Sequence, residues 1–127
     1  MTRGVRGATT VSENEEHQMI ENTRVLVKEM VETNQIKPND ISHVFISVTR
    51  DLNAGFPAKA LRQLEGDGWS LVPVMCMAEI EVPGSLTQCI RIMMVVNTER
   101  AQADIQHIFH NEAIKLRPDL VKRKENN

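Results

Sequence analysis

The sequence predicts a single-domain mixed α/β (α+β) fold, in which a mixed β-sheet packs against one long helix. Three observations support this prediction. The chain has 127 residues, which suits one domain with a hydrophobic core. One segment has the apolar spacing of an amphipathic helix, and several short β-rich segments lie between glycine, proline and asparagine residues. We expect residues 1–120 to form the domain and residues 121–127 to be a mobile polar tail.

The first strand and the long helix are predicted from the N-terminal 34 residues. The stretch "VRGATTV" (5–11) is short and rich in β-branched residues. Ser12 and Glu15 then have the spacing of a capping box, which predicts a helix start. The expected buried stripe of this helix has apolar residues at helical spacing: Met19, Thr23, Leu26, Val27, Met30 and Val31.

Strands and short turns are predicted for the rest of the chain. Pro38 marks a break, residues 43–49 form a second strand, and Pro57 begins a short helix that ends before "GDG". Residues 69–80 form a third strand, in which Pro73 indicates a sheet edge or a bulge. After the turn "VPGS", a fourth strand follows over 88–97. A helical turn over 100–105, a short strand over 106–111 and an extended segment over 113–120 complete the chain.

Composition and charge exclude several classes of partner. The chain is 41% apolar and 25% charged with a net charge of -2, which gives no reason to expect nucleic acid or a membrane surface as a partner. No apolar run has the length of a bilayer span, and "MTRGVRGATT" lacks the apolar core of a secretory signal, so we expect a cytoplasmic protein. The cysteines Cys76 and Cys89 are then expected to be free thiols.

Three charged residues do not fit a solvated surface. Arg91 lies in the strand "QCIRIMMVVN", which is apolar on both faces and is therefore expected to be buried on both. A buried guanidinium is costly unless an anion meets it. Glu79 ends an apolar run, and Arg6 is followed by Gly7, which would let a ligand approach the backbone closely. A structural Arg91–Glu79 ion pair is one explanation, but two arginines against one carboxylate leave a positive surplus that favours a small anionic ligand.

Other reactive residue types give weaker signals. His107 and His110 are three apart on an expected strand, so they point to opposite faces and are not expected to share a metal ion. Cys76 has no adjacent base in the sequence, so nucleophilic chemistry is not expected. The sequence contains no phosphate-binding loop and no dinucleotide-binding fingerprint. We therefore predict no metal and no cofactor.

Four blocks give the sequence a resemblance to a known family: "RGVRGATTV", "FPAKALRQL", "VPVMCMAEIEVPGSLTQCIRIMM" and "LRPDL". They occur in the order seen in the monofunctional, trimeric chorismate mutases of the Bacillus type, the AroH class. The resemblance implies a pseudo α/β barrel, a homotrimer with active sites between subunits, and the rearrangement of chorismate to prephenate in aromatic amino-acid biosynthesis. It also implies an isomerase that uses no cofactor, metal or covalent intermediate.

The resemblance assigns roles to four residues as the catalytic set. Arg91 matches the arginine that contacts the ether oxygen and a substrate carboxylate, where negative charge develops in the transition state. Arg6 matches the arginine that binds the other end of the dianion. Glu79 matches the acceptor for the ring hydroxyl of the substrate, and Cys76 matches a residue near that hydroxyl.

Further substrate-binding residues follow from the same resemblance. They line one wall of the site, its edge from the adjacent subunit, or its mouth: Met75, Met77, Ala78, Phe56, Lys59, Arg62, Leu116 and Arg117.

Two departures from the family pattern concern the site. The family often has a tyrosine at the position of Phe109, so this substrate-binding position lacks a hydroxyl donor and we expect Phe109 to contribute by packing. Met75 replaces a smaller polar residue. Cys76 and Glu79 are three apart, so both face a ligand only if the strand bends or ends between them. The alternatives are a small-carboxylate-binding trimer and a reactive-imine deaminase of related fold, neither of which requires Arg6, Glu79 and Arg91 together.

Overall fold

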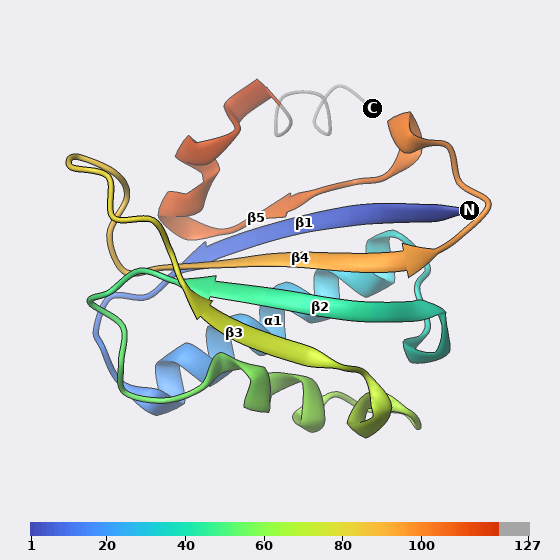
Figure 1. Cartoon of the computed structure of the whole chain (residues 1–127), viewed down its shortest axis with the longest axis horizontal. Helices are drawn as coiled ribbons and strands as arrows, with labels where there is room; N and C mark the ends of the chain where they lie inside the picture. The colour runs from blue at the N-terminus through green and yellow to red at the C-terminus, as the bar shows by residue number, and fades with distance from the viewer. Residues whose placement is uncertain (120–127) are drawn as a thin grey trace.

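The computed structural model describes residues 1–119, so the tail predicted at 121–127 lies outside the described residues. Five strands form one sheet in the order β3-β2-β4-β1-β5 (Figure 1). They are β1 (Thr2–Thr10), β2 (Ile41–Val48), β3 (Val74–Ala78), β4 (Cys89–Asn97) and β5 (Ile108–Phe109). β4 pairs antiparallel with β1 and β2, while β5 and β3 pair parallel with β1 and β2 respectively. The predicted mixed sheet is confirmed.

The long helix α1 (Glu16–Thr33) covers one face of the sheet and lies behind it in Figure 1. Met19, Thr23, Leu26, Val27 and Met30 are buried as the stripe predicts, and Val31 is half-buried. No helix in the described part of the chain combines the length and the apolar character that crossing a membrane requires. The single-domain fold with one long helix is therefore confirmed.

The predicted capping box at the start of α1 is wrong. The N-cap is Glu15, whose carboxylate accepts hydrogen bonds from the backbone N–H groups of His17 and Gln18. Ser12 lies outside the helix, where its backbone N–H donates to the side-chain oxygen of Gln18 at 2.7 Å. The free N–H groups of the first turn are thus satisfied by a residue three positions later than the sequence indicated.

Short 3₁₀ helices lie in several connections between strands and after β5. They are η1 (Pro38–Asp40), η2 (Pro57–Gln63), η3 (Trp69–Leu71), η4 (Gln102–Asp104) and η5 (Asn111–Leu116). Two corrections follow: the first part of the predicted strand 69–80 is η3, and the segment predicted as extended over 113–120 begins within η5. Pro73 immediately precedes the edge strand β3, as its missing N–H favours.

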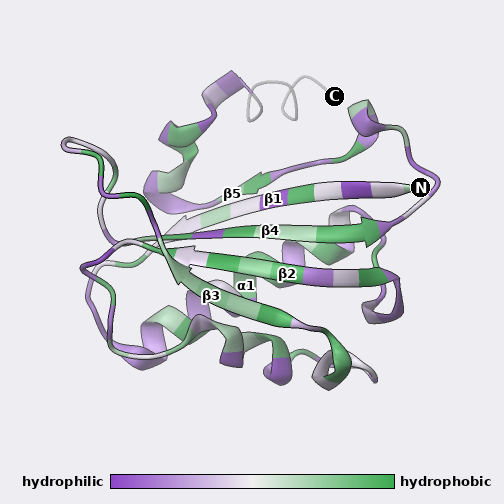
Figure 2. Ribbon diagram, viewed as in Figure 1, coloured by the Kyte–Doolittle hydropathy of each residue, from purple (hydrophilic) through white to green (hydrophobic). Residues whose placement is uncertain are grey.

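The two faces of the sheet differ in burial. Ile90, Ile92, Met94 and Val96 of β4 point toward α1 and are at most 2% exposed. The opposite face, which we call the open face, carries apolar residues that remain exposed within the chain: Phe45, Met75, Met77 and Met93. Figure 2 shows the hydrophobic colouring along β2, β3 and β4. Burial of β4 on both faces is therefore not found within one chain.

Gly7 serves the packing of helix on sheet. A Cβ atom at Gly7 would lie 2.4 Å from the Sδ of Met30 and 3.3 Å from a methyl carbon of Leu26. The prediction that Gly7 opens the backbone to a ligand is wrong, because this position faces α1. The absence of a side chain lets the helix approach β1 closely.

Candidate active site

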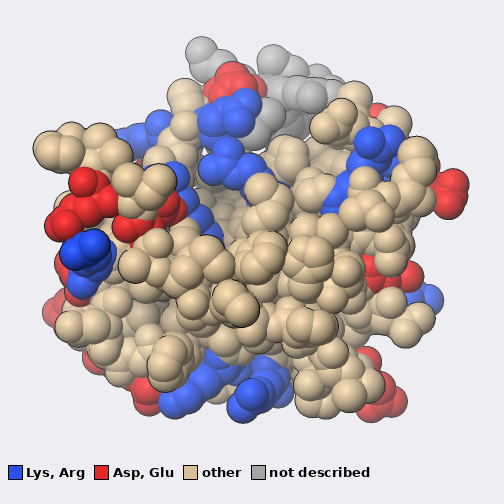
Figure 3. Space-filling view, in the orientation of Figure 1, with Lys and Arg blue, Asp and Glu red and all other residues tan. Residues whose placement is uncertain are grey.

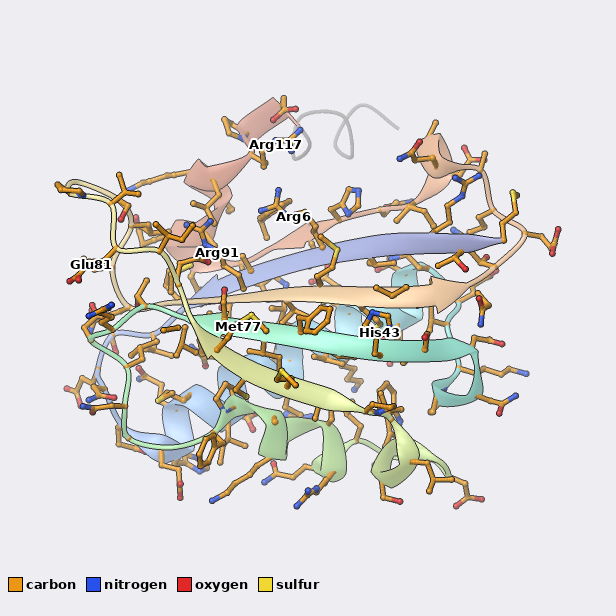
Figure 4. The ribbon with its side chains drawn as sticks, viewed as in Figure 1. Arg6, His43, Met77, Glu81, Arg91 and Arg117 are labelled. Carbon is orange, nitrogen blue, oxygen red and sulfur yellow. The ribbon has the colours of Figure 1, made fainter. Side chains whose placement is uncertain are left out.

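Arg91 lies on the open face, near the beginning of β4, which is the central strand of the sheet (Figure 4). Register places it between Ala8 of β1 and Ser47 of β2. Its side chain is 29% exposed, and its Nε lies 3.4 Å from an oxygen of Glu79. Among the residues that the structure describes, no acceptor makes a hydrogen bond to this buried Nε. A buried donor without an acceptor is costly, so Arg91 presents a donor that an oxygen of a ligand would satisfy.

Glu79 faces Arg91 because it continues the alternation of Met75 and Met77, which lie on the open face. The backbone N–H of Glu79 donates to the carbonyl of Val48 at 2.9 Å, and its carboxylate accepts from the Oγ of Ser47 at 2.7 Å. The hydrogen bond from Ser47 is the largest cause that lowers the pKa of Glu79, while partial burial opposes it. The N–H of Ile80 and the charges of Arg91 and Arg6 lower this pKa further. Glu79 is therefore held as a carboxylate.

Arg6 extends from β1 on the same face as Arg91 (Figure 4). Its guanidinium lies 5.8 Å from the centre of the Phe109 ring. Burial is the main cause that lowers the pKa of Arg6, followed by repulsion from Arg117 and Arg91, while Glu79 acts in the opposite direction. Arg117 pairs with Asp119, so Arg6 and Arg91 together face the single carboxylate of Glu79, and the charge of this group is positive.

The C-terminal segment borders this region. Arg117 follows η5, and its guanidinium donates to both side-chain oxygens of Asp119 at 3.0 and 3.1 Å. Phe109 is buried in a small cluster against Ala8 and Ala113, with Leu116 at its edge. In the space-filling view, lysine and arginine atoms gather beside a large uncharged area over the open face (Figure 3).

Cys76 points to the other side of the sheet. It pairs with the buried Ile46 and packs against the core next to η2. Burial raises the pKa of the Cys76 thiol, and a contact with the backbone of Ala58 opposes that rise to a lesser extent. Cys76 and Glu79 therefore lie on opposite faces of the sheet, as their odd spacing predicts for a regular strand.

A second group of the predicted site residues lies at the β3 edge. A hollow of about 580 Å³ separates β3 from the loop before η2, and Phe56, Cys76, Met77 and Ala78 help to line it. On η2, Lys59 lies 3.2 Å from a carboxylate oxygen of Glu16, and Arg62 is exposed in the last turn. η2 packs against α1 and β3, away from β1 and β5.

The predicted residues therefore form two groups within one chain. The arginine group on the open face contains Arg6, Glu79, Arg91, Phe109, Leu116 and Arg117. The edge group at β3 and η2 contains Phe56, Lys59, Arg62, Cys76 and Ala78, and Met75 and Met77 lie on the exposed sheet face between the groups.

The histidines of the HxxH pair bind different partners. The Nδ1 of His107 accepts from the backbone N–H of Arg6 at 2.9 Å, and the Nε2 of His110 contacts the carboxylate of Glu29. Within residues 1–119, no three histidine, cysteine, aspartate or glutamate side chains are grouped to hold a metal ion.

Two residues of the site were missed by sequence reasoning, namely Ser47 and His107. A hydroxyl inside the apolar strand "HVFISVT" is the signal at Ser47, but only strand register places it beside Arg91. His107 was considered only as a metal ligand, and its contact with Arg6 spans 101 positions of the chain.

Fold and side-chain placement together define an α+β protein with a group of arginines, Arg6, Arg91 and Arg117, near Glu79 on one face of its sheet. The family model of chorismate mutase type I matches residues 2–120. The chain is 46% identical over 120 residues to chorismate mutase AroH of Bacillus subtilis (strain 168), covering 94% of this chain and 93% of that protein. It is 40% identical over 121 residues to chorismate mutase AroH of Thermus thermophilus, covering 94% and 97%.

A solved structure has the same fold. A chorismate mutase from Clostridium thermocellum superposes with a TM-score of 0.82 at 47% sequence identity, covering 87% of this chain and 96% of that one. The chain belongs to the type I chorismate mutase family, as its sequence motifs predicted.

Proposed function

We propose that this protein catalyses the rearrangement of chorismate to prephenate, a step of aromatic amino-acid biosynthesis, at the arginine group of the open face. The observation that carries the proposal is the buried Nε of Arg91, which lacks a hydrogen-bond acceptor among the described residues although Glu79 lies 3.4 Å away. In this intramolecular reaction one C–O bond breaks as one C–C bond forms, so no proton or electron is exchanged with the protein.

Arg91 stabilises the charge that develops on the ether oxygen. That oxygen becomes more negative as its bond to carbon breaks, so a fixed cation binds the transition state more tightly than the substrate. The partial burial of Arg91 strengthens this preference, because few water molecules compete for the donor. The guanidinium is already held in place by its strand before substrate binds.

The neighbouring charges hold the substrate in its reactive shape. Arg6 binds a carboxylate, Arg117 contributes positive charge at the border of the site, and Glu79 accepts a hydrogen bond from the ring hydroxyl. The depressed pKa of Glu79 keeps it an acceptor. Holding both ends of the dianion brings the reacting carbons together and supplies the remainder of the rate acceleration as positioning.

The complete site is formed between copies of the chain in a homotrimer. Two features support this part of the proposal: the edge group is separated from the arginine group within one chain, and the open face carries exposed apolar side chains. A neighbouring copy covers that face and brings Phe56, Lys59, Arg62 and Cys76 to Arg91. The domain comprises residues 1–120, the enzyme acts in the cytoplasm, and it requires neither metal nor cofactor.

The test follows the loss of chorismate absorbance with the wild-type protein and with Arg91 variants. Arg91→Ala should lower kcat/KM by at least about 100-fold, since a lost oxyanion-type donor costs on the order of 3 kcal/mol or more. Arg91→Lys should be nearly as poor, because an ammonium group cannot reproduce the planar fork of donors.

Arg24→Ala is the matched control, since Arg24 pairs with Glu21 on the surface of α1. Near-normal turnover by Arg91→Lys would contradict the assigned role. Absence of chorismate turnover by the wild type, with turnover of a reactive imine, would favour the related deaminase.

A further inference from the structure

The backbone N–H of Arg6 donates to a side chain, at a position where the carbonyl of a neighbouring strand would ordinarily accept it. In a parallel ladder, the residue opposite position j donates to the carbonyl of j−1 and accepts from the N–H of j+1. Ala8 follows this rule with Phe109, since the N–H of His110 donates to the carbonyl of Ala8 at 2.9 Å. The same rule would direct the N–H of Arg6 to the carbonyl of Gln106.

The carbonyl of Gln106 is directed elsewhere. It accepts from the side-chain amide of Asn34 at 2.8 Å, and the N–H of Gln106 donates to the Oδ1 of Asn34 at 2.8 Å. Asn34 is the C-cap of α1 and is 3% exposed, so this pair ties the chain before β5 to the helix. The ladder stops there, and the Nδ1 of His107 accepts the N–H of Arg6 at 2.9 Å instead.

We propose that His107 is a positioning residue that orients Arg6 through its neutral, Nε2-protonated ring and releases it on acidification; this rests on the proposed function. Acceptance at Nδ1 requires a lone pair on that nitrogen, so the proton of the neutral ring is on Nε2. The imidazolium has N–H groups on both nitrogens and has no acceptor for Arg6. Protonation therefore removes the bond that fixes the backbone from which the Arg6 side chain extends.

Charged groups lie on the elements around this contact. Arg6, whose backbone N–H donates to His107, interacts electrostatically with Arg117, Arg91 and Glu79. At the far end of β5, Glu29 of α1 contacts His110. Arg3 on β1 donates to the carbonyl of Arg100, and Asp104 is exposed in η4. Protonation of His107 changes its Nδ1 from a hydrogen-bond acceptor into a donor. The loss of the bond from the Arg6 N–H is therefore the change that distinguishes His107 from the other charged groups.

The activity test uses the pH profile of kcat/KM for chorismate. We expect the wild type to lose kcat/KM on acidification over the range in which histidines titrate, about pH 8 to pH 5. His107→Ala should lower kcat/KM about tenfold or more near pH 8, mostly through KM, because Arg6 binds substrate and transition state alike, and this deficit should shrink on acidification as the wild type loses the same bond. His107→Asn, whose Oδ1 replaces Nδ1 as acceptor without titrating, should keep wild-type kcat/KM within about threefold near pH 8 and lose the acid limb.

Two control variants identify the source of the acid limb. His17→Asn alters an exposed histidine at the start of α1 and should reproduce the wild-type profile. His110→Asn should also retain the limb, and its loss there would assign the limb to His110 and overturn the proposal. An unchanged limb in His107→Asn, or wild-type KM in His107→Ala, would also overturn it.

NMR provides a readout that does not depend on turnover. Long-range ¹H–¹⁵N spectra should show an unprotonated Nδ1 on His107, and the Arg6 amide resonance should move with the titration of that ring. A proton on Nδ1 in the neutral ring would overturn the proposal whether or not chorismate is turned over. An inactive wild type with the expected His107 tautomer would instead refute the proposed function alone.

Discussion

Three side chains in contact, Ser47, Glu79 and Arg91, set the charge distribution of the site. Ser47 on β2 donates to Glu79, which follows β3, and Glu79 lies 3.4 Å from Arg91 on β4. Glu79 therefore has a hydrogen-bond partner in addition to the arginine, whereas the buried Nε of Arg91 has no acceptor among residues 1–119. This asymmetry leaves the cation available to a ligand.

Removal of the Ser47 hydroxyl should raise the pKa of Glu79, because that hydrogen bond is the largest cause lowering it. The wild-type pKa lies below the ordinary value of 4.5, so ionised Glu79 stabilises the fold above pH 4.5, and this contribution is lost as the pH falls through the folded-state value. Ser47→Ala should therefore cost about 1 kcal/mol of unfolding free energy at neutral pH, and the deficit should shrink on acidification.

The measurements are a ¹³C titration of the Glu79 carboxyl and urea unfolding at several pH values. Ser42→Ala is the matched control, because Ser42 is exposed on the same strand and its hydroxyl contacts His43. A Glu79 pKa that does not rise in Ser47→Ala would show that the carboxylate is held by other contacts.

At the scale of elements, the close approach of α1 to β1 depends on Gly7. Gly7→Ala should lower the unfolding free energy by about 1–3 kcal/mol, since the new methyl group would overlap the buried side chain of Met30. Gly4→Ala is the matched control on the same strand. Its added Cβ would lie 3.1 Å from Met93 Sδ on the open face, so we expect a change within about 0.5 kcal/mol.

Urea unfolding at fixed protein concentration measures both glycine variants. The double variant Gly7→Ala with Met30→Ala should be less destabilised than the sum of the two single variants, because the added methyl fills part of the space left by Met30. Strict additivity would mean that the two side chains do not compete for one space.

The elements that the sequence predicted well are those with a clear period. The buried stripe from Met19 to Met30 repeats over about three turns at helical spacing, and a strand, whose period is two, does not satisfy that spacing. The segment 69–80 has no such period, because an apolar run of that length is compatible with both a strand and a buried turn. Trp69 of η3 is buried, whereas Leu71, in the same 3₁₀ helix, is 82% exposed, so only the second part of this run, β3 at the sheet edge, was predicted correctly as a strand.

The site was predictable to the extent that its residues broke a local pattern. Arg91 and Glu79 are charges in apolar segments, and their pairing was anticipated from the sequence. Ser47 and His107 break no pattern that sequence alone can read, because each acts on a residue 32 or 101 positions away. The prediction at Gly7 was wrong because a glycine beside an arginine is equally compatible with the close approach of a ligand and with the close packing of a helix.

At the scale of the whole molecule, the separation of the two groups of site residues sets a test of assembly. Arg91 and Arg6 belong to the arginine group, and Arg62 belongs to the edge group. If a neighbouring copy supplies the edge group, Arg91→Ala and Arg62→Ala damage different halves of each site. Chains that carry these variants should then complement each other within one trimer.

The size of the rescue follows from the geometry of a ring. In a trimer assembled at random from equal amounts of the two inactive variants, each site combines one half from each of two neighbouring chains. One site in four receives both undamaged halves, so activity should return to about 25% of wild type. Arg91→Ala mixed with Arg6→Ala is the matched control and should give no rescue, because both substitutions lie in the same half and every site contains one of them. With mixed trimers verified by native mass spectrometry and both single variants inactive, no rescue in the first mixture would mean that each site lies within a single chain. Full activity of Arg62→Ala alone would show instead that Arg62 is dispensable.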